Sequence, residues 1–285
     1  MHIIFSDLDG SLHHRDHGFH PQDLHTLHRL PEHQVLRVIA TGRSLYSAQQ
    51  VLTPAFPIDY LIFSSGAGIL HWPTQKLIYS AHLNPEDISP LLQFFEQHQL
   101  DFFLHGEVPD NHYFWCHRFS EENTDYETRR QLYPGLDQPL TPPLRHWPEN
   151  APCSQAIIFV SAERTEATHH LLTTQLPHLS IIRSTSPFDK KSAWLEIFPA
   201  QVSKSQSAQW LQRHLNAHQG FASMAFGNDY NDSDLLAWAD AGYVVTSAPA
   251  DLKAHHTEVS DPHQAGFTAA FKQWQAHFLQ DHPAL

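Results

Sequence analysis

Two carboxylates stand two residues apart near the start of the chain, directly after a short apolar run. Asp7 and Asp9 follow residues 2–5, and Gly10 comes next, so both acids lie where a buried strand would turn into a loop. Two such carboxylates can hold Mg²⁺ through hard oxygen ligands, or one can attack phosphorus while the other moves a proton. An Asx turn that caps the loop has the same composition.

Two later segments carry groups that suit a phosphate. The apolar residues 38–40 precede Thr41 and Gly42, and a hydroxyl with free backbone N–H groups at a helix start can bind a phosphate oxygen. An ordinary helix cap has the same pattern. Lys204 opens another predicted helix, where the helix dipole disfavours a cation unless phosphate or carboxylates face it. A solvated surface lysine is the alternative interpretation.

A second polar, acidic loop lies towards the end of the chain. The pattern of residues 225–236 predicts a strand end, a glycine, a loop and a helix start, with Asn228, Asp229 and Asp232 in the loop. Their side-chain oxygens could supply further metal ligands. A solvated acidic helix cap is the alternative.

The elements that must position these groups follow from the alternation of apolar runs and helical spacings, which predicts an α/β protein. The expected strands are 2–5, 34–39, 60–63, 194–198, 222–226 and 243–245, and the expected helices are 21–30, 44–52, 203–218, 232–239 and 265–279. Because sites in such sheets lie at the carboxyl ends of the strands, we expect the candidate residues to gather at one edge.

The middle of the chain has a different pattern, which predicts a separate α+β module. Its expected helices are 85–98, 121–132 and 165–175, its expected strands are 101–105, 113–119, 155–160 and 179–183, and residues 134–152 are expected to form a loop. The predicted architecture is a doubly wound, Rossmann-like parallel sheet built from 1–82 and 187–285, with an α+β cap inserted at 83–186.

Composition limits the classes of partner. The 17 basic and 30 acidic residues give a formal charge of −13, which disfavours non-specific binding to nucleic acid or anionic lipid. No apolar stretch is long enough for a membrane span, and no secretory signal follows Met1, so we expect a cytoplasmic protein. The two cysteines, Cys116 and Cys153, make neither a disulfide framework nor a zinc site.

At this point the chain resembles the haloacid dehalogenase (HAD) superfamily of aspartate-nucleophile hydrolases. The four segments around Asp7, Thr41, Lys204 and Asn228 occur in the order of that family's motifs, and a large inserted module is typical of its Cof-type subgroup. The resemblance covers about residues 1–82 and 187–285, whereas the cap matches by length and position. It implies a Mg²⁺-dependent phosphatase that acts on a small phosphomonoester, most simply a sugar phosphate.

The resemblance also implies catalytic roles. Asp7 would be the nucleophile, and Asp9 would be the general acid for the leaving group and then the base for water. Thr41 and Gly42 would hold a phosphoryl oxygen. Lys204 would offset charge between Asp7 and the phosphoryl group.

The implied Mg²⁺ ligands are the Asp7 side chain, the Asp9 backbone carbonyl, Asn228 and Asp232. The family usually has an acid where this chain has Asn228. An amide oxygen can still bind Mg²⁺ but brings no charge, so we expect weaker metal affinity. A local shift that brings Asp229 to this position is the alternative.

Two other functions are compatible with the same motifs. The phosphoaspartate could return its group to a sugar, as in a phosphohexose mutase of the same superfamily, or the chain could bind a phosphorylated metabolite with little turnover. We expect a monomer or homodimer. The cap would supply substrate selectivity, with cationic candidates at Arg118, Arg129, Arg130, Arg183, Lys190 and Lys191.

Overall fold

A computed structural model describes residues 2–141, 151–215 and 222–279. The chain divides into two compact units. The core unit comprises Met1–Arg43, Gln49–Ile78 and Ser203–Leu285, and the inserted unit comprises Ser44–Ala48 and Tyr79–Val202. Among the described residues, no helix is both long and apolar enough to cross a membrane.

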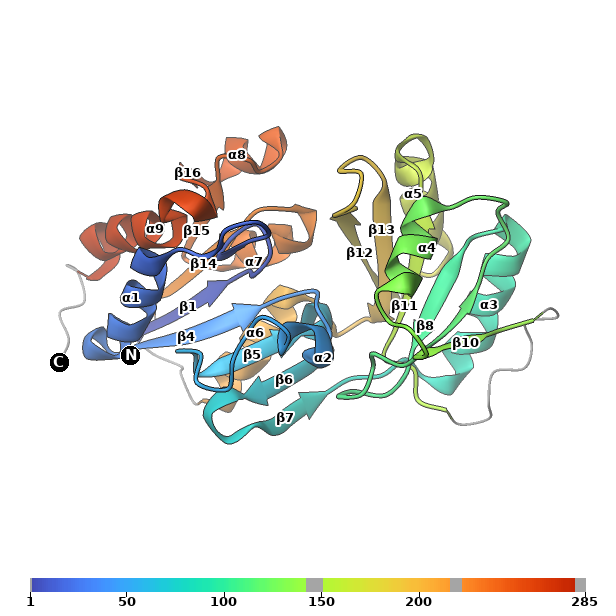
Figure 1. Cartoon of the computed structure of the whole chain (residues 1–285), viewed down its shortest axis with the longest axis horizontal. Helices are drawn as coiled ribbons and strands as arrows, with labels where there is room; N and C mark the ends of the chain where they lie inside the picture. Colours follow the sequence, from blue (N-terminus) through green and yellow to red (C-terminus); the bar gives the residue numbers. More distant parts are fainter. Residues whose placement is uncertain (1, 142–150, 216–221, 280–285) are drawn as a thin grey trace. The chain divides into compact units, whose positions relative to one another are not determined.

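The core unit is built on an eight-stranded sheet (Figure 1). In spatial order its strands are β16 (Thr257–Val259), β15 (Ala241–Val245), β14 (Ser223–Gly227), β1 (His2–Ser6), β4 (Val35–Ala40), β5 (Tyr60–Phe63), β6 (Gly68–His71) and β7 (Lys76–Ser80). The strands from β16 to β5 pair in parallel, and β6 pairs antiparallel to β5. A two-stranded ribbon of β2 (His13–His14) and β3 (Gly18–Phe19) follows β1.

The order of the strands places a topological switch point between β1 and β14. From β1 the chain moves outward through β4 and β5, and it returns much later to the other side of β1 as β14. All five residues of β1 are buried, as expected for a central parallel strand covered on both faces. Ligands of such sheets bind at the carboxyl ends of the strands that flank the switch point.

Helices cover this sheet in packed pairs. The core helices are α1 (Pro21–Arg29), α6 (Lys204–His214), α7 (Ser233–Trp238), α8 (Ala250–His255) and α9 (Gly266–Trp274). Helix α1 packs against α9, and α6 packs against α7. Helix α9 buries Phe267, Phe271 and Trp274, a spacing of four and three residues that places them on one helix face.

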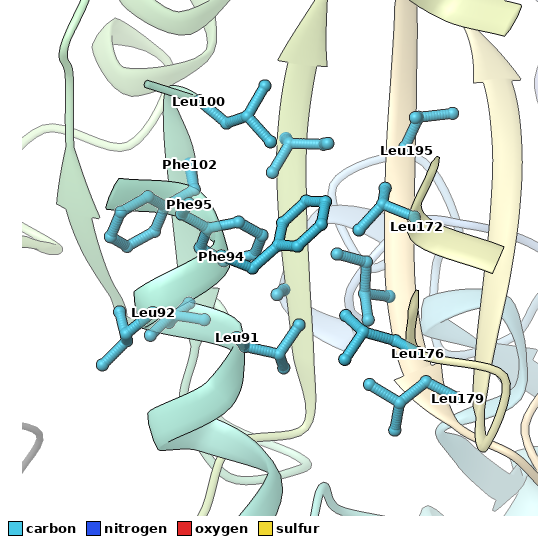
Figure 2. Close-up of a cluster of buried hydrophobic side chains, with 14 of the residues drawn as sticks. Leu91, Leu92, Phe94, Phe95, Leu100, Phe102, Leu172, Leu176, Leu179 and Leu195 are labelled. Carbon is cyan, nitrogen blue, oxygen red and sulfur yellow. The ribbon is translucent and has the colours of Figure 1, made fainter. Parts of the chain in front are cut away.

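The inserted unit contains a second sheet with helices. Its strands, in spatial order, are β10 (Asp137–Pro139), β9 (Phe114–His117), β8 (Phe102–His105), β11 (Gln155–Val160), β13 (Ala193–Pro199) and β12 (Leu179–Thr185). Its helices are α2 (Leu45–Ala48), α3 (Pro85–His98), α4 (Thr124–Gln131) and α5 (Thr165–Gln175). Figure 2 shows one apolar core of this unit, where side chains of α3 and α5 meet those of the sheet, among them Leu91, Phe95, Leu172 and Leu195.

The expected fold class, a doubly wound parallel sheet with an inserted α+β unit, is confirmed. The second boundary of the insertion differs from the expected one at 186/187. Strand β13 pairs antiparallel with both β11 and β12, so residues 193–199 lie inside the inserted unit, which continues to Val202. The apolar residues of β13 suit either sheet. Its pairing with strands distant in the sequence therefore determines the sheet to which it belongs.

Smaller differences concern ends and loops. The strand β10 lies within the expected loop 134–152, of which 142–150 fall outside the described residues. Helix α6 ends at His214, and the remainder of the helix expected to reach 218 lies partly outside the described residues. The expected closing helix ends as an α-helix at Trp274, and a π-helical turn continues to Leu279.

Candidate active site

Asp7 lies at the switch point of the core sheet. It directly follows β1, and its backbone N–H donates to the carbonyl oxygen of Phe226 in β14 over 2.8 Å. The chain then turns at Gly10, which has a φ of +81°. A Cβ there would lie within 2.5 Å of the Asn228 amide, so glycine is needed both for the turn and for the close approach.

Lys204 is buried between two carboxylates. It is the first residue of α6, it has no exposed surface, and its Nζ donates to Asp7 Oδ1 (2.7 Å) and to Asp232 Oδ1 (2.6 Å). Burial alone would lower the pKa of Lys204, but the charges of Asp232 and Asp7 outweigh it and hold the pKa above its usual value. The lysine therefore stays charged despite its place at a helix start.

The same surroundings act in the opposite direction on Asp7. Burial and the nearby charge of Asp232 raise the pKa of the Asp7 carboxyl to about 7, although Lys204 lowers it. Two carboxylates that share one cation leave a net negative charge in a buried place, and such a charge resists ionisation. A further cation beside Asp7 would favour its ionised form.

Asp232 holds the loop after β14 in place. Its Oδ2 accepts the backbone N–H groups of Asn228 (2.9 Å) and Asp229 (3.2 Å), while Oδ1 accepts from Lys204. The Asp229 carboxylate in turn accepts the backbone N–H of Asp232 and caps a short turn. Asn228 is the residue of this loop whose side chain lies 3.2 Å from Asp7 Oδ2. Because both oxygens of Asp232 already bind protein donors, it is better suited to positioning the site than to direct contact with a metal.

Asp9 has a different environment from Asp7. Its side chain is 48% exposed, and Arg43 binds it through two hydrogen bonds, Nε to Oδ2 (2.6 Å) and Nη2 to Oδ1 (2.7 Å). Burial alone would raise the pKa of Asp9, but Arg43 and His13 outweigh it and lower the pKa to about 2. Arg43 was not among the residues expected from the sequence. Its position directly after Thr41 and Gly42 places it near the site, but that position does not specify its partner.

The segment of Thr41 and Gly42 lies at the end of β4. Thr41 is buried, and its Oγ1 accepts the backbone N–H of Arg43 at 3.2 Å. The backbone N–H groups of Ser64 and Ser65 donate to the carbonyls of Arg43 (2.7 Å) and Thr41 (2.9 Å). Both serines have left-handed backbone angles, φ 49° and 52°, which are strained for residues with a side chain. The strained loop thus binds the Thr41 segment, and the pairing of β4 with β1 places that segment beside the Asp7 strand.

Asn228 lies next to the oxygens that the sequence assigned to a metal. Ser11 Oγ donates to the Asn228 side-chain oxygen over 3.2 Å. This end of the amide lies 3.1 Å from the Asp9 backbone oxygen and 3.2 Å from Asp7 Oδ2, where an NH₂ group in place of the oxygen would donate to both. A carboxylate oxygen, a carbonyl oxygen and an amide thus converge, and hard oxygen donors of this kind suit Mg²⁺. Among the described residues, no three His, Cys, Asp or Glu side chains form a metal-binding group, so any site here depends on the amide and the backbone.

Half of the six expected cationic residues of the inserted unit are paired with carboxylates within it. Arg118 pairs with Glu127 (2.8 Å), Arg130 with Asp137 (2.7 Å), and Arg183 with Glu166. Arg129 instead lies over the ring of Trp194, 4.5 Å from its centroid. Lys190 and Lys191 are exposed. Among the described residues, Arg129 therefore differs from the three paired arginines, because its guanidinium contacts an aromatic ring and not a carboxylate.

Known proteins resemble this chain over nearly its whole length. An HMP-PP phosphatase of Cronobacter sakazakii is 27% identical over 293 aligned positions, covering 98% of this chain and 96% of the relative. Two solved structures share the fold. A sugar phosphatase of HAD subclass IIB has a TM-score of 0.72 at 18% identity, covering 96% of this chain and 99% of that one. A HAD phosphatase from Bacteroides thetaiotaomicron has a TM-score of 0.74 at 17% identity, with coverages of 96% and 95%.

The family itself follows from a match to most of the chain. The sequence profile of the haloacid dehalogenase-like hydrolases matches residues 4–267, a range that spans β1, the inserted unit and the beginning of α9. This range includes every candidate residue described above. The chain is an enzyme of the haloacid dehalogenase-like hydrolase family.

Proposed function

We propose that the chain is a Mg²⁺-dependent phosphatase that hydrolyses a small phosphorylated metabolite, such as a sugar phosphate, through a phosphoaspartyl intermediate on Asp7. The observation that carries this proposal is the buried Lys204 between Asp7 and Asp232. A buried ion pair contributes little net stability because desolvation opposes it. Its presence is better explained by chemistry that develops negative charge beside Asp7.

In the proposed reaction an Asp7 oxygen forms a bond to phosphorus while the bond from phosphorus to the leaving oxygen breaks. The leaving oxygen takes up a proton and departs as an alcohol. Water then attacks phosphorus, releases inorganic phosphate and restores the Asp7 carboxylate. Lys204 offsets the charge on Asp7 and the phosphoryl oxygens, and the Thr41 and Gly42 segment binds a phosphoryl oxygen through its hydroxyl and N–H groups.

Asp9 is the proposed proton donor to the leaving oxygen and acceptor from water. Proton transfer in either direction requires the ion pair with Arg43 to open, because that pair holds the pKa of Asp9 near 2. A guanidinium binds a phosphate with the same two-point geometry as a carboxylate. A phosphoryl group that competes for Arg43 would therefore release Asp9.

Asp7, the Asp9 backbone carbonyl and Asn228 are the proposed Mg²⁺ ligands, with Asp232 supporting the loop or acting through water. When bound, Mg²⁺ neutralises charge on the phosphoryl oxygens and favours the ionised form of Asp7.

The inserted unit is proposed to select the substrate. Two classes deserve direct comparison: sugar phosphates, which fit the general chemistry of the site and the name of one structural relative, and HMP-PP, which is named in a relative that covers nearly the whole chain. A phosphatase releases inorganic phosphate from either. A mutase would instead interconvert isomeric sugar phosphates without accumulating phosphate.

The first test is hydrolysis of p-nitrophenyl phosphate with Mg²⁺, with a chelator, and by Asp7→Asn. Asn keeps the shape of Asp7 but is a far poorer nucleophile, so we expect turnover to fall by at least about a thousandfold. Asp251→Asn, an exposed position on α8, is the matched control and should retain full activity. Phosphate release would then be compared for sugar phosphates and HMP-PP. An Asp7→Asn protein with undiminished turnover would exclude Asp7 as the nucleophile.

A further inference from the structure

The imidazole of His13 lies beside the Asp9 carboxylate. His13 is the first residue of β2, its side chain is 13% exposed, and its Nδ1 lies 3.8 Å from Asp9 Oδ1. Among the described residues, this buried nitrogen has no hydrogen-bond partner. The distance to Asp9 is too long for a hydrogen bond, so a group that can donate faces the proposed acid–base residue without binding it.

The backbone fixes the place of His13 relative to Asp9. The His13 N–H donates to the Leu8 carbonyl oxygen (2.8 Å), and the Gly10 N–H donates to the His13 carbonyl oxygen (2.9 Å). Across the ribbon of β2 and β3, the ring of His13 contacts the ring of Phe19, with centroids 4.8 Å apart. Because these contacts hold the imidazole, a short movement of the more exposed Asp9 carboxylate would close the gap between them.

Arg43 occupies both oxygens of the Asp9 carboxylate. Its Nε donates to Oδ2 and its Nη2 to Oδ1, so the ion pair must open before Asp9 can exchange a proton with the leaving oxygen. When it opens, Asp9 loses two hydrogen bonds that orient a side chain with 48% of its surface exposed. A general acid must stay within hydrogen-bond reach of its target, so another contact has to hold the carboxyl group.

We propose that His13 is a positioning residue: when Arg43 releases Asp9, the Nδ1–H of His13 donates to Asp9 Oδ1 and leaves Oδ2 available to the leaving oxygen. This inference rests on the proposed function and names the residue that keeps its acid–base group in place. The imidazole can donate in its neutral form, so no change in its charge is required. With Oδ1 held as an acceptor, Oδ2 is the oxygen that exchanges the proton.

The test compares His13→Phe with His13→Asn. Phe keeps a ring that can pack on Phe19 but has no N–H, whereas the amide of Asn places an N–H close to the position of Nδ1. His17→Phe, at an exposed position between β2 and β3, is the matched control. Each variant is assayed on p-nitrophenyl phosphate, whose leaving group departs without protonation, and on glycerol 1-phosphate, whose alkoxide has to be protonated. The ratio kcat/KM reports on the steps up to the departure of the leaving group.

We expect His13→Phe to lower kcat/KM by at least about tenfold for glycerol 1-phosphate and by less than about twofold for p-nitrophenyl phosphate, because only the poor leaving group needs the acid. His13→Asn should regain most of this loss, and His17→Phe should match wild type. A merely structural role of His13 would affect both esters alike. Equal losses on the two esters, or a loss that Asn does not restore, would overturn the proposal.

A measurement without turnover separates this inference from the proposed function. The NMR signal of the His13 Cε1–H, assigned by its loss in His13→Phe, is compared between wild type and Arg43→Ala at one pH. Removal of the competing guanidinium should let His13 bind Asp9, so the signal should shift in Arg43→Ala, and this shift should disappear when Asp9→Ala is added. An unchanged His13 signal in Arg43→Ala would overturn the proposal. A wild-type protein that hydrolyses neither ester would count against the proposed function, and the NMR comparison would still decide the role of His13.

Discussion

The core unit and the inserted unit bury polar side chains in different ways. In the core unit, Lys204, Asp7 and Asp232 lie in direct contact as charged groups, and Lys204 has no exposed surface. This arrangement concentrates three charges in one buried place. It also makes the unit dependent on each member, because removal of one leaves an uncompensated buried charge.

In the inserted unit, buried polar groups bind neutral partners. The Glu196 carboxylate accepts from Gln155 Nε2 (3.2 Å) and Ser184 Oγ (3.0 Å). His105 is buried, and its Nδ1 lies 2.7 Å from the Asn111 carbonyl, which requires that Nδ1 carry the proton. Burial, together with the charge of Arg129, lowers the pKa of His105 to about 3, so this imidazole is neutral near pH 7.

The difference indicates where charge is needed. A charged cluster costs stability and is retained beside the proposed nucleophile, whereas neutral hydrogen bonding suffices within a sheet that has to pack. The two units should therefore respond to different perturbations: the core unit to loss of a charge partner, and the inserted unit to acid.

The largest expected effect is that of Lys204→Met. The variant leaves Asp7 and Asp232 as adjacent buried carboxylates without their cation, so it should lower the free energy of unfolding by about 3–5 kcal/mol at neutral pH. Urea unfolding measures this change. Lys272→Met, on an exposed position of α9, removes the same charge from the same unit and should change stability by less than about 0.5 kcal/mol. Equal effects of the two variants would mean that the cluster has no special electrostatic role.

The next effect concerns acid and the inserted unit. The unfolded chain protonates His105 near pH 6.5, whereas the folded protein does so only near pH 3, so the unfolded state binds more protons between these values. Stability should therefore fall as the pH falls through this window, and His105 should account for about 2 kcal/mol of the loss at pH 5.

His105→Gln removes this titration and should flatten the loss of stability between pH 7 and pH 5, as measured by urea unfolding. His170→Gln, at an exposed position of α5, is the control and should follow the wild-type curve. If His105→Gln and wild type lose stability in parallel as the pH falls, the acid sensitivity has another origin.

Much of the fold follows from local sequence. The helices Pro85–His98 and Thr165–Gln175 and the strands Tyr60–Phe63 and Gln155–Val160 have the predicted bounds, because their apolar spacing and their flanking residues agree. Strand Ala193–Pro199 lies in the sheet of the inserted unit and not in the core sheet expected for it. It lies directly before Lys204, and its apolar pattern carries no information on whether it pairs with the core or with the insertion.

The candidate site was predictable only in part. The contact of Lys204 with Asp7 joins residues 197 positions apart, and the order of the motifs was enough to predict that they lie close together. The ion pair between Arg43 and Asp9, at the exposed rim of the site, could not be predicted from the order of the motifs. Whether Arg43 faces Asp9 or solvent depends on loop geometry that neither residue type nor spacing determines.

The smallest expected effect on stability belongs to this rim pair. The Arg43–Asp9 pair is half-exposed, so Arg43→Ala should lower the free energy of unfolding by less than about 1 kcal/mol, and by less still when salt is raised to about 0.5 M. Arg29→Ala breaks a comparable exposed pair with Glu32 and should cost as little. Turnover should separate the two variants: Arg43→Ala should lower kcat/KM, because Arg43 positions Asp9 and offers two-point binding to a phosphoryl group, whereas Arg29→Ala should not. If Arg43→Ala instead destabilises the protein as much as Lys204→Met, the Arg43–Asp9 pair belongs energetically to the buried charge cluster. The expected difference in stability between that cluster and the exposed pair would then be wrong.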